Sequence, residues 1–170
     1  MLFSVLYRAG IVADNVTGGI QFETPKNEGL KRQAFSKEVM AAILEKMDST
    51  TQTGLRDRAL FELIYSSGLR VSEAANLLVK DVSFPRREMI VRGKFGRDRI
   101  VPISKIARNY LVLYLDTRIH DTDTPVFQGV YRNQGLKPGS ISRHFSDLLK
   151  NYGIKKEGLS AHSIRHASAS

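Results

Sequence analysis

The sequence predicts a mainly helical domain with a small antiparallel β-sheet. Apolar residues recur at helical spacing over most of the chain, and one stretch near its middle has β-branched residues on both sides of a glycine-containing turn. The chain has 170 residues, of which 42% are hydrophobic, so it is long enough to bury a substantial core. We therefore expect one domain together with a fragment of another.

The N-terminal region is expected to lie outside this domain. Residues 1 to about 12 have the spacing of a helix, and glycines and a proline between residues 14 and 33 are typical of a linker. We expect residues 1–20 to contain a helix of a preceding domain, residues 21–33 to form the linker, and residues 34–170 to form the main domain.

Local signals then place the elements of the main domain. Ser36, Ser104 and Ser140 are candidate N-caps, and Gly68 and Gly153 are candidate helix stops. The expected elements are helices over 36–48, 53–67 and 71–79, a hairpin of 88–92 with 98–103, and helices over 104–118, 140–152 and from 160 onward.

The charge distribution limits the classes of partner. The formal net charge is +9, and residues 86–108 hold eight basic and two acidic residues, a local net charge of +6. Such a surface attracts nucleic acid or anionic lipid, although a solvated charged face is an equally open interpretation. The absence of cysteine excludes a disulfide scaffold, a thiol nucleophile and Cys-ligated zinc or iron–sulfur sites. No apolar run approaches ~18 residues, and no signal peptide is evident, so we expect a cytoplasmic protein without a membrane partner.

Two arginine- and lysine-containing turns are candidate phosphate sites. Arg70 lies in the turn 68–73 between two predicted helices, where its fork of donors suits a phosphate. Taken alone, that segment favours a salt bridge from Arg70 to Glu73 over a phosphate site. Lys94 lies on the predicted hairpin tip, where the alternative is an edge hairpin kept soluble by its charge.

A third cluster lies near the C-terminus. His162, Arg165 and His166 are spaced so that they lie on adjoining faces of one helix. The two histidines do not predict a zinc site, because Ser163 stands where the usual zinc helix has Glu and no cysteine is present. We therefore expect no metal, and the lack of a G-x-S-x-G motif also argues against a serine hydrolase. An ordinary amphipathic helix is the alternative.

The order of these three segments is more specific than any one of them. The sequence YSSGLRVSEAANLLVKDV (65–82), then GKFGRDRIVPIS (93–104), then LSAHSIRHASAS (159–170) resembles the tyrosine recombinases, the phage-integrase family of Xer-like enzymes. The resemblance implies the tyrosine recombinase catalytic-domain fold for residues 34–170, incomplete at its C-terminus. Residues 1–20 resemble the last helix of the family's core-binding domain.

The resemblance also implies roles for individual residues. Arg70 and Arg165 would bind the scissile phosphate and stabilise the charge that develops on it. Lys94 would act as general acid toward the leaving 5′-hydroxyl, and His162 would assist proton transfer at the nucleophile.

Other residues would support this chemistry. Glu73 would brace Arg70, and His166 is a second supporting residue. Arg92, Arg97 and Arg99 of the basic hairpin are expected to contact DNA.

The sequence departs from the family pattern at three points. Phe95 follows the lysine where the family often has glycine, and Ser168 replaces a usual aromatic residue. All six tyrosines precede the H-x-x-R motif, whereas the family's nucleophilic tyrosine follows it. The nucleophile is thus expected beyond Ser170, and the chain is expected to be truncated before it.

The expected function is site-specific recombination of double-stranded DNA, as in integration or excision. The resemblance implies cleavage and rejoining through a 3′-phosphotyrosine intermediate by a homotetramer on DNA, without a metal or small-molecule cofactor. A nucleoid-associated protein of a bacterium, phage or mobile element fits this expectation. Two alternatives stay open: a non-catalytic DNA-binding relative of the integrases, and a generic basic helical protein that binds RNA or lipid.

Overall fold

The computed structural model describes residues 36–93, 97–129, 134–154 and 164. The predicted N-terminal helix, the linker and most of the last predicted helix lie outside the described residues, so the expected domain boundary stays a prediction. Among the helices in the described part of the chain, none combines the length and the hydropathy needed to cross a membrane.

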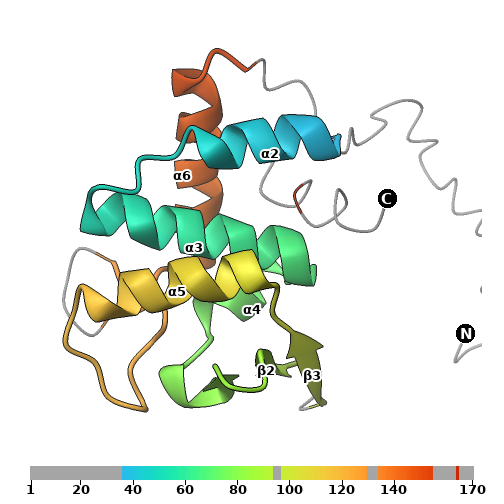
Figure 1. The fold of residues 1–170 in the computed structure, drawn as a ribbon, viewed down its shortest axis with the longest axis vertical. Coiled ribbons are helices and arrows are strands. Elements are labelled where there is room, and N and C mark those ends of the chain that lie inside the picture. Colours follow the sequence, from blue (N-terminus) through green and yellow to red (C-terminus); the bar gives the residue numbers. More distant parts are fainter. Residues whose placement is uncertain (1–35, 94–96, 130–133, 155–163, 165–170) are drawn as a thin grey trace, which may run out of the picture. The chain divides into compact units, whose positions relative to one another are not determined.

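Three helices form one layer of the domain. They are α2 (Lys37–Glu45), α3 (Gln52–Ser67) and α5 (Lys105–Asp116), which lie side by side with α3 in the middle (Figure 1). The Ser36 hydroxyl accepts a hydrogen bond from the Val39 amide at 3.3 Å, and the Ser104 hydroxyl accepts one from the Ala107 amide at 3.0 Å. These contacts confirm the two predicted N-caps, which satisfy amides that have no partner within a helix.

A fourth long helix, α6 (Pro138–Asn151), crosses behind this layer. Its buried residues Ile141, Phe145 and Leu149 recur every four positions and so share one face. The Phe145 ring packs against Phe61 of α3 with ring centroids 5.0 Å apart. Ile164, the one described residue of the last predicted helix, is also fully buried in this core.

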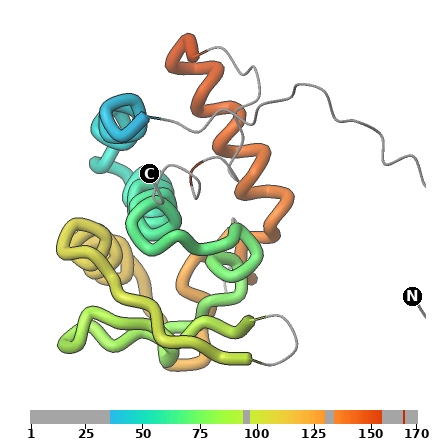
Figure 2. The backbone as a smooth tube through the Cα atoms, turned by 90° about the vertical axis from the view of Figure 1, so that its right-hand side faces the viewer, coloured from blue at the N-terminus to red at the C-terminus, as the bar shows by residue number. Residues whose placement is uncertain are grey.

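The sheet has three antiparallel strands in the order β1 (Val82–Ser83), β2 (Glu88–Arg92) and β3 (Asp98–Pro102). Figure 2 shows β2 and β3 running side by side below the helices. Met89, Val91 and Val101 are buried on the inner face, whereas the cross-strand pair Ile90 and Ile100 is exposed on the outer face. The mainly helical fold with a small antiparallel sheet is thus confirmed.

Several predicted boundaries were wrong. The third helix, α4 (Val71–Ala75), ends four residues early, and the 3₁₀ turn η1 (Val79–Asp81) follows it. The cause is non-local: the Leu77 carbonyl accepts a hydrogen bond from the Val126 amide at 2.8 Å, so the chain leaves the helix to pair with a distant loop. Helix α2 likewise ends at Glu45 rather than at residue 48, where it was predicted to end.

The start of α6 was also predicted wrongly. The helix begins at Pro138 with Lys137 as its N-cap, not at Ser140. Proline has no amide hydrogen and a φ already suited to a helix, so it fits the first turn, where amides have no partner in any case. The predicted stop at Gly153 is confirmed by its φ of 70°.

Candidate functional site

The turn between α3 and α4 fixes the position of Arg70. Gly68 ends α3 with a φ of 60°, a left-handed conformation that glycine adopts without a steric penalty. Leu69 is fully buried and anchors the turn in the core. Arg70 follows in an extended conformation as the N-cap residue of α4, and its side chain is 52% exposed. The turn therefore presents this guanidinium to solvent from a rigid backbone.

Glu73, one turn further along α4, binds Arg70 twice. One carboxylate oxygen, Oε1, accepts a hydrogen bond from Arg70 Nη1 at 2.9 Å. The other, Oε2, accepts one from the Arg70 backbone amide at 2.8 Å. The Glu73 side chain is only 6% exposed, so these contacts hold Arg70 by its backbone and by its side chain. The supporting role that the sequence predicts for Glu73 is consistent with this geometry.

Arg99 of β3 completes the cluster. Its Nη1 donates to Glu73 Oε1 at 2.9 Å and its Nη2 donates to Glu73 Oε2 at 2.8 Å, a bidentate contact. Arg99 shares the inner face of β3 with Val101, and this places its side chain toward α4. We call Arg70, Glu73 and Arg99 the arginine–glutamate cluster.

The cluster carries more positive than negative charge. Burial alone would raise the pKa of Glu73, but hydrogen bonds from Arg99 and from Arg70 outweigh it and lower the pKa to about 2. The hydrogen bonds with Glu73 in turn raise the pKa of Arg99. At neutral pH two guanidinium groups therefore face one carboxylate. Because both guanidiniums are partly exposed, the cluster can bind an anion with the donors that Glu73 does not occupy.

The hairpin is attached to the same turn at a second point. The Ser67 hydroxyl at the end of α3 donates to the Pro102 carbonyl at the end of β3, at 2.9 Å. At the other end of the hairpin, the Gly93 amide donates to the Arg97 carbonyl at 3.0 Å. Arg92 lies on the outer face of the sheet, 58% exposed, with Asp81 at 3.7 Å. Arg97 is also exposed.

Four of the predicted catalytic and supporting residues lie outside the described residues: Lys94, His162, Arg165 and His166. Lys94 lies between the described residues Gly93 and Arg97 in the sequence, and the buried Ile164 lies between His162 and Arg165 in the sequence. The structure therefore brings together Arg70, Glu73 and Arg99, while the positions of the other four stay predictions. In the described segments, no group of three or more His, Asp or Glu side chains is arranged to hold a metal ion.

The contact between Arg99 and Glu73 was not predicted from the sequence. Arg99 was expected to contact DNA, and that role stays a prediction beside the new contact. The alternation of β3 contained a usable signal, because Arg99 falls on the same face as Val101 and opposite Val91. A charged residue on the inner face of a strand requires a partner of opposite charge. Glu73 is the acidic residue that follows Arg70 in the sequence, three positions further on.

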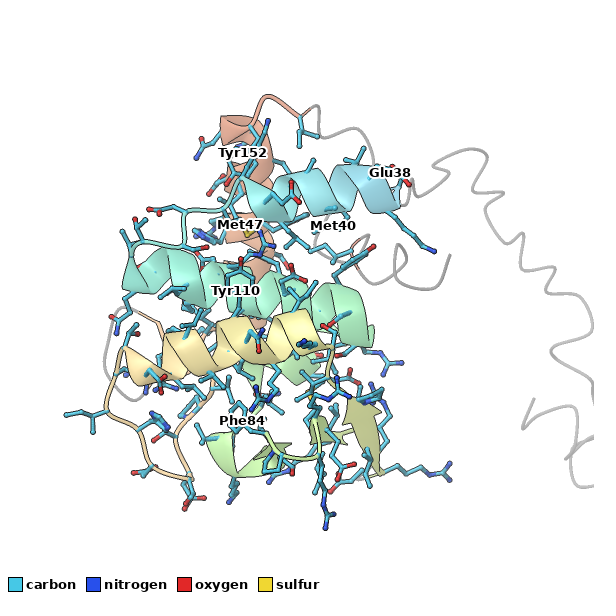
Figure 3. All side chains as sticks on the ribbon, in the orientation of Figure 1. Glu38, Met40, Met47, Phe84, Tyr110 and Tyr152 are labelled. Atoms are coloured by element: carbon cyan, nitrogen blue, oxygen red, sulfur yellow. The ribbon has the colours of Figure 1, made fainter. Side chains whose placement is uncertain are left out.

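The described tyrosines have structural contacts. The Tyr114 ring stacks on Phe127 with centroids 6.2 Å apart, and its hydroxyl accepts a hydrogen bond from the Gln128 amide at 3.3 Å. Tyr110 lies between α3 and α5 with the Arg58 guanidinium 4.6 Å from its ring centroid (Figure 3). Tyr152 donates to the Lys46 carbonyl at 3.0 Å, and burial raises the pKa of this phenol.

The other three tyrosines are Tyr7, Tyr65 and Tyr131. Tyr65 is half-buried against the core, and Tyr7 and Tyr131 lie outside the described residues.

A second ionic contact joins α3 to α6. His144 Nε2 lies 2.6 Å from Asp57 Oδ2, and the Arg56 guanidinium contacts the other oxygen of the same carboxylate at 2.8 Å. The hydrogen bond to Asp57 raises the pKa of His144 despite the opposing effect of burial.

Comparison with known proteins identifies the family to which this chain belongs. The family model described as "Phage integrase family" matches residues 33–170. Tyrosine recombinase XerC of Chromobacterium violaceum is 34% identical over 169 residues, which cover 97% of this chain and 54% of the relative. The chain therefore belongs to the phage integrase family, and it spans about half the length of the curated relative.

Solved structures agree with this assignment. The crystal structure of XerA recombinase is 29% identical and superimposes with a TM-score of 0.69, covering 80% of this chain and 48% of XerA. The integrase of the Tn1549 transposon, in complex with transposon right end DNA, has a TM-score of 0.74 at 16% identity, covering 98% and 62% of the two chains. The second likeness shows the shared fold alone.

Proposed function

We propose that this chain is part of a site-specific tyrosine recombinase that cleaves and rejoins double-stranded DNA. The observation that carries the proposal is the arginine–glutamate cluster, in which Glu73 holds Arg70 at the turn by its backbone amide and the Arg70 side chain is half-exposed to solvent. The family resemblance supports the proposal, because it matches Arg70 to the first catalytic arginine of the phage integrase family.

The proposed reaction is a phosphoryl transfer. A tyrosine oxygen forms a bond to the scissile phosphorus while the bond from phosphorus to the 5′ oxygen breaks, which leaves a 3′-phosphotyrosine. The tyrosine loses its proton and the 5′ oxygen gains one. Because the phosphodiester bond energy is retained in the intermediate, attack by a 5′-hydroxyl reverses the step without ATP.

The residues would divide this work. Arg70, together with Arg165, would stabilise the charge on the non-bridging oxygens, an interaction that strengthens in the transition state. Lys94 would protonate the leaving oxygen and His162 would assist proton transfer at the tyrosine. The support for these three residues is the family resemblance.

Duplex DNA is the proposed partner. Residues 86–108 carry a net charge of +6, and the exposed side chains of Arg92 and Arg97 belong to this segment. The Tn1549 integrase, which shares the fold, is solved with transposon right end DNA. We further propose that the whole protein works as a homotetramer on its DNA site, within the cytoplasm.

Salt-dependent DNA binding tests the proposal. If the basic segment neutralises phosphates, log K should fall linearly with log salt between ~50 and ~200 mM, with a slope of about −0.9 for each phosphate contacted. Fluorescence anisotropy of a labelled duplex measures this slope for the 170-residue chain. Arg70→Ala should weaken binding modestly without abolishing it. An affinity that does not change with salt would contradict nucleic-acid binding by this surface.

A further inference from the structure

The two arginines of the cluster bind Glu73 in different ways. Arg99 uses two nitrogens and contacts both carboxylate oxygens, at 2.9 and 2.8 Å. Arg70 contacts the carboxylate through Nη1 alone, at 2.9 Å, and through its backbone amide. Arg99 therefore matches the two carboxylate oxygens with two hydrogen bonds. A guanidinium has five N–H donors, and because Arg70 uses only one side-chain nitrogen on Glu73, it has more donors available for another ligand.

The charge of the cluster depends on Arg99. Glu73 is buried and ionised, and a buried carboxylate needs a paired cation. With Arg70 as its only cationic partner, Glu73 would form a neutral pair and would cancel the attraction of Arg70 for a phosphate. With both arginines the cluster has a net charge of +1. Arg70 and Arg99 each place Nη1 2.9 Å from the same oxygen, so this surplus charge is concentrated beside Arg70.

The strand holds Arg99 in this position. Arg99 pairs with Val91 in the register of β2 and β3 and belongs to the inner face of the sheet, whereas Arg92 belongs to the outer face. The hydrogen bond from Ser67 to the Pro102 carbonyl fixes the same strand to the end of α3. The distance between Arg99 and the Arg70 turn is therefore set by the backbone at two points.

We propose that Arg99 is a positioning residue: it is the principal counterion of Glu73, so that Glu73 orients Arg70 without cancelling the attraction of Arg70 for a DNA phosphate. This inference rests on the proposed function. It differs from a direct contact between Arg99 and DNA, because the effect of Arg99 on DNA would pass through Glu73 and Arg70.

A double-mutant cycle separates these two roles. Duplex affinity is measured for the full 170-residue chain, for Arg70→Met, for Arg99→Met and for the double variant, at one salt concentration and at a temperature where circular dichroism shows each protein folded. We expect each single substitution to weaken binding roughly fivefold and the double variant to be no more than about twofold weaker than Arg70→Met alone. A merely structural role of Arg99 would lower the unfolding midpoint without producing this coupling.

Arg92→Met is the matched control, because Arg92 is an arginine of the same hairpin on the opposite face of the sheet. Its effect on affinity should multiply with that of Arg70→Met, since the two side chains share no carboxylate in the described contacts.

A second measurement does not involve DNA. The pKa of the Glu73 carboxyl group, followed by carbon-detected NMR, should rise from about 2 in the parent chain toward 4.5 in Arg99→Met. It should stay unchanged in Arg86→Met, whose side chain is 78% exposed and contacts Glu88 instead. No rise in Arg99→Met would overturn the counterion role.

Each outcome of the binding measurements leads to a different conclusion. If the effects of Arg70→Met and Arg99→Met multiply, Arg99 contacts DNA independently and the inference is wrong. If Arg70→Met weakens binding and Arg99→Met does not, the inference is also wrong while the proposed function survives. If neither substitution alters binding, the phosphate site itself fails and the inference fails with it.

Discussion

The carboxylate of Glu73 accepts hydrogen bonds from both terminal nitrogens of Arg99, at 2.9 and 2.8 Å, across 26 residues of sequence. This contact joins helix α4 to strand β3. It places the turn that presents Arg70 and the basic hairpin in one rigid unit. The properties of that unit lead to predictions about stability, about phosphate chemistry and about the fold.

Loss of the Glu73 charge should destabilise the protein in a pH-dependent way. The folded pKa of about 2 lies below the ordinary value of 4.5, so the contribution is fully present above pH 4.5 and is lost as the pH falls through 2. At roughly 1.4 kcal/mol per pKa unit, the stabilisation at neutral pH is on the order of 3 kcal/mol. Urea unfolding of Glu73→Gln should show a large deficit at pH 7 and a smaller one at pH 3.

Glu45→Gln is the control for that series, because Glu45 is exposed at the end of α2. Its unfolding free energy should differ little from that of the parent chain at either pH. A Glu73→Gln deficit of equal size at pH 7 and pH 3 would show that the charge of Glu73 contributes nothing.

The contact between His144 and Asp57 should produce the opposite pH dependence. The pKa of His144 is raised in the folded protein, so its stabilisation is fully present below the unfolded value of 6.5 and is lost as the pH rises through the folded pKa. His144→Gln should therefore be more destabilising at pH 5.5 than at pH 9. Chemical unfolding at both pH values measures this difference, with the exposed His120→Gln as a control. Equal deficits at the two pH values would refute the assignment.

The turn before Arg70 should tolerate substitution poorly. Gly68 has a φ of 60°, and an alanine there would adopt a left-handed conformation at a cost of about 1 kcal/mol or more. Gly139 provides the comparison, because it lies within α6 with open space around a Cβ position. Gly139→Ala should stabilise the protein by a few tenths to about 1 kcal/mol in thermal unfolding. A neutral or stabilising Gly68→Ala would contradict the turn geometry.

The sequence predicted the parts of the fold that depend on neighbouring residues. Hydroxyl side chains at Ser36 and Ser104 begin helices, and Gly68 and Gly153 end them, because each signal acts within one turn of the backbone. The sequence-based prediction failed where a helix gives way to hydrogen bonds with a distant segment. The third helix ends at Ala75 because the following residues bond to the loop near Val126, and strand β1 is too short to show alternation.

In the candidate site, too, the local contact was predicted and the long-range contact was not. The contact of Arg70 with Glu73 spans three residues and was anticipated, whereas the contact of Glu73 with Arg99 depends on the position of a strand and was not.

Substitution of Arg70 should affect cleavage far more than binding. An interaction that strengthens in the transition state appears in the rate, so Arg70→Ala should lower the cleavage rate by 100-fold or more, roughly the effect of removing one preorganised donor, while affinity changes modestly. The assay uses a chimera in which residues 33–170 replace the matched segment of the Chromobacterium violaceum XerC relative. Arg86→Ala, an exposed charge, should leave the rate within about threefold. Equal losses from both substitutions would remove Arg70 from the reaction.

Formation of a covalent DNA adduct by this chimera is the direct test of strand cleavage through a 3′-phosphotyrosine. The substrate is a duplex nicked next to the scissile phosphate, so that the released strand diffuses away and a 3′-phosphotyrosine persists as a band on a denaturing gel. The XerC relative on its own site is the positive control. We predict an adduct with the chimera and none with its Arg70→Ala variant. A folded chimera that binds the site but yields no adduct would contradict the account and would favour a non-catalytic DNA-binding protein.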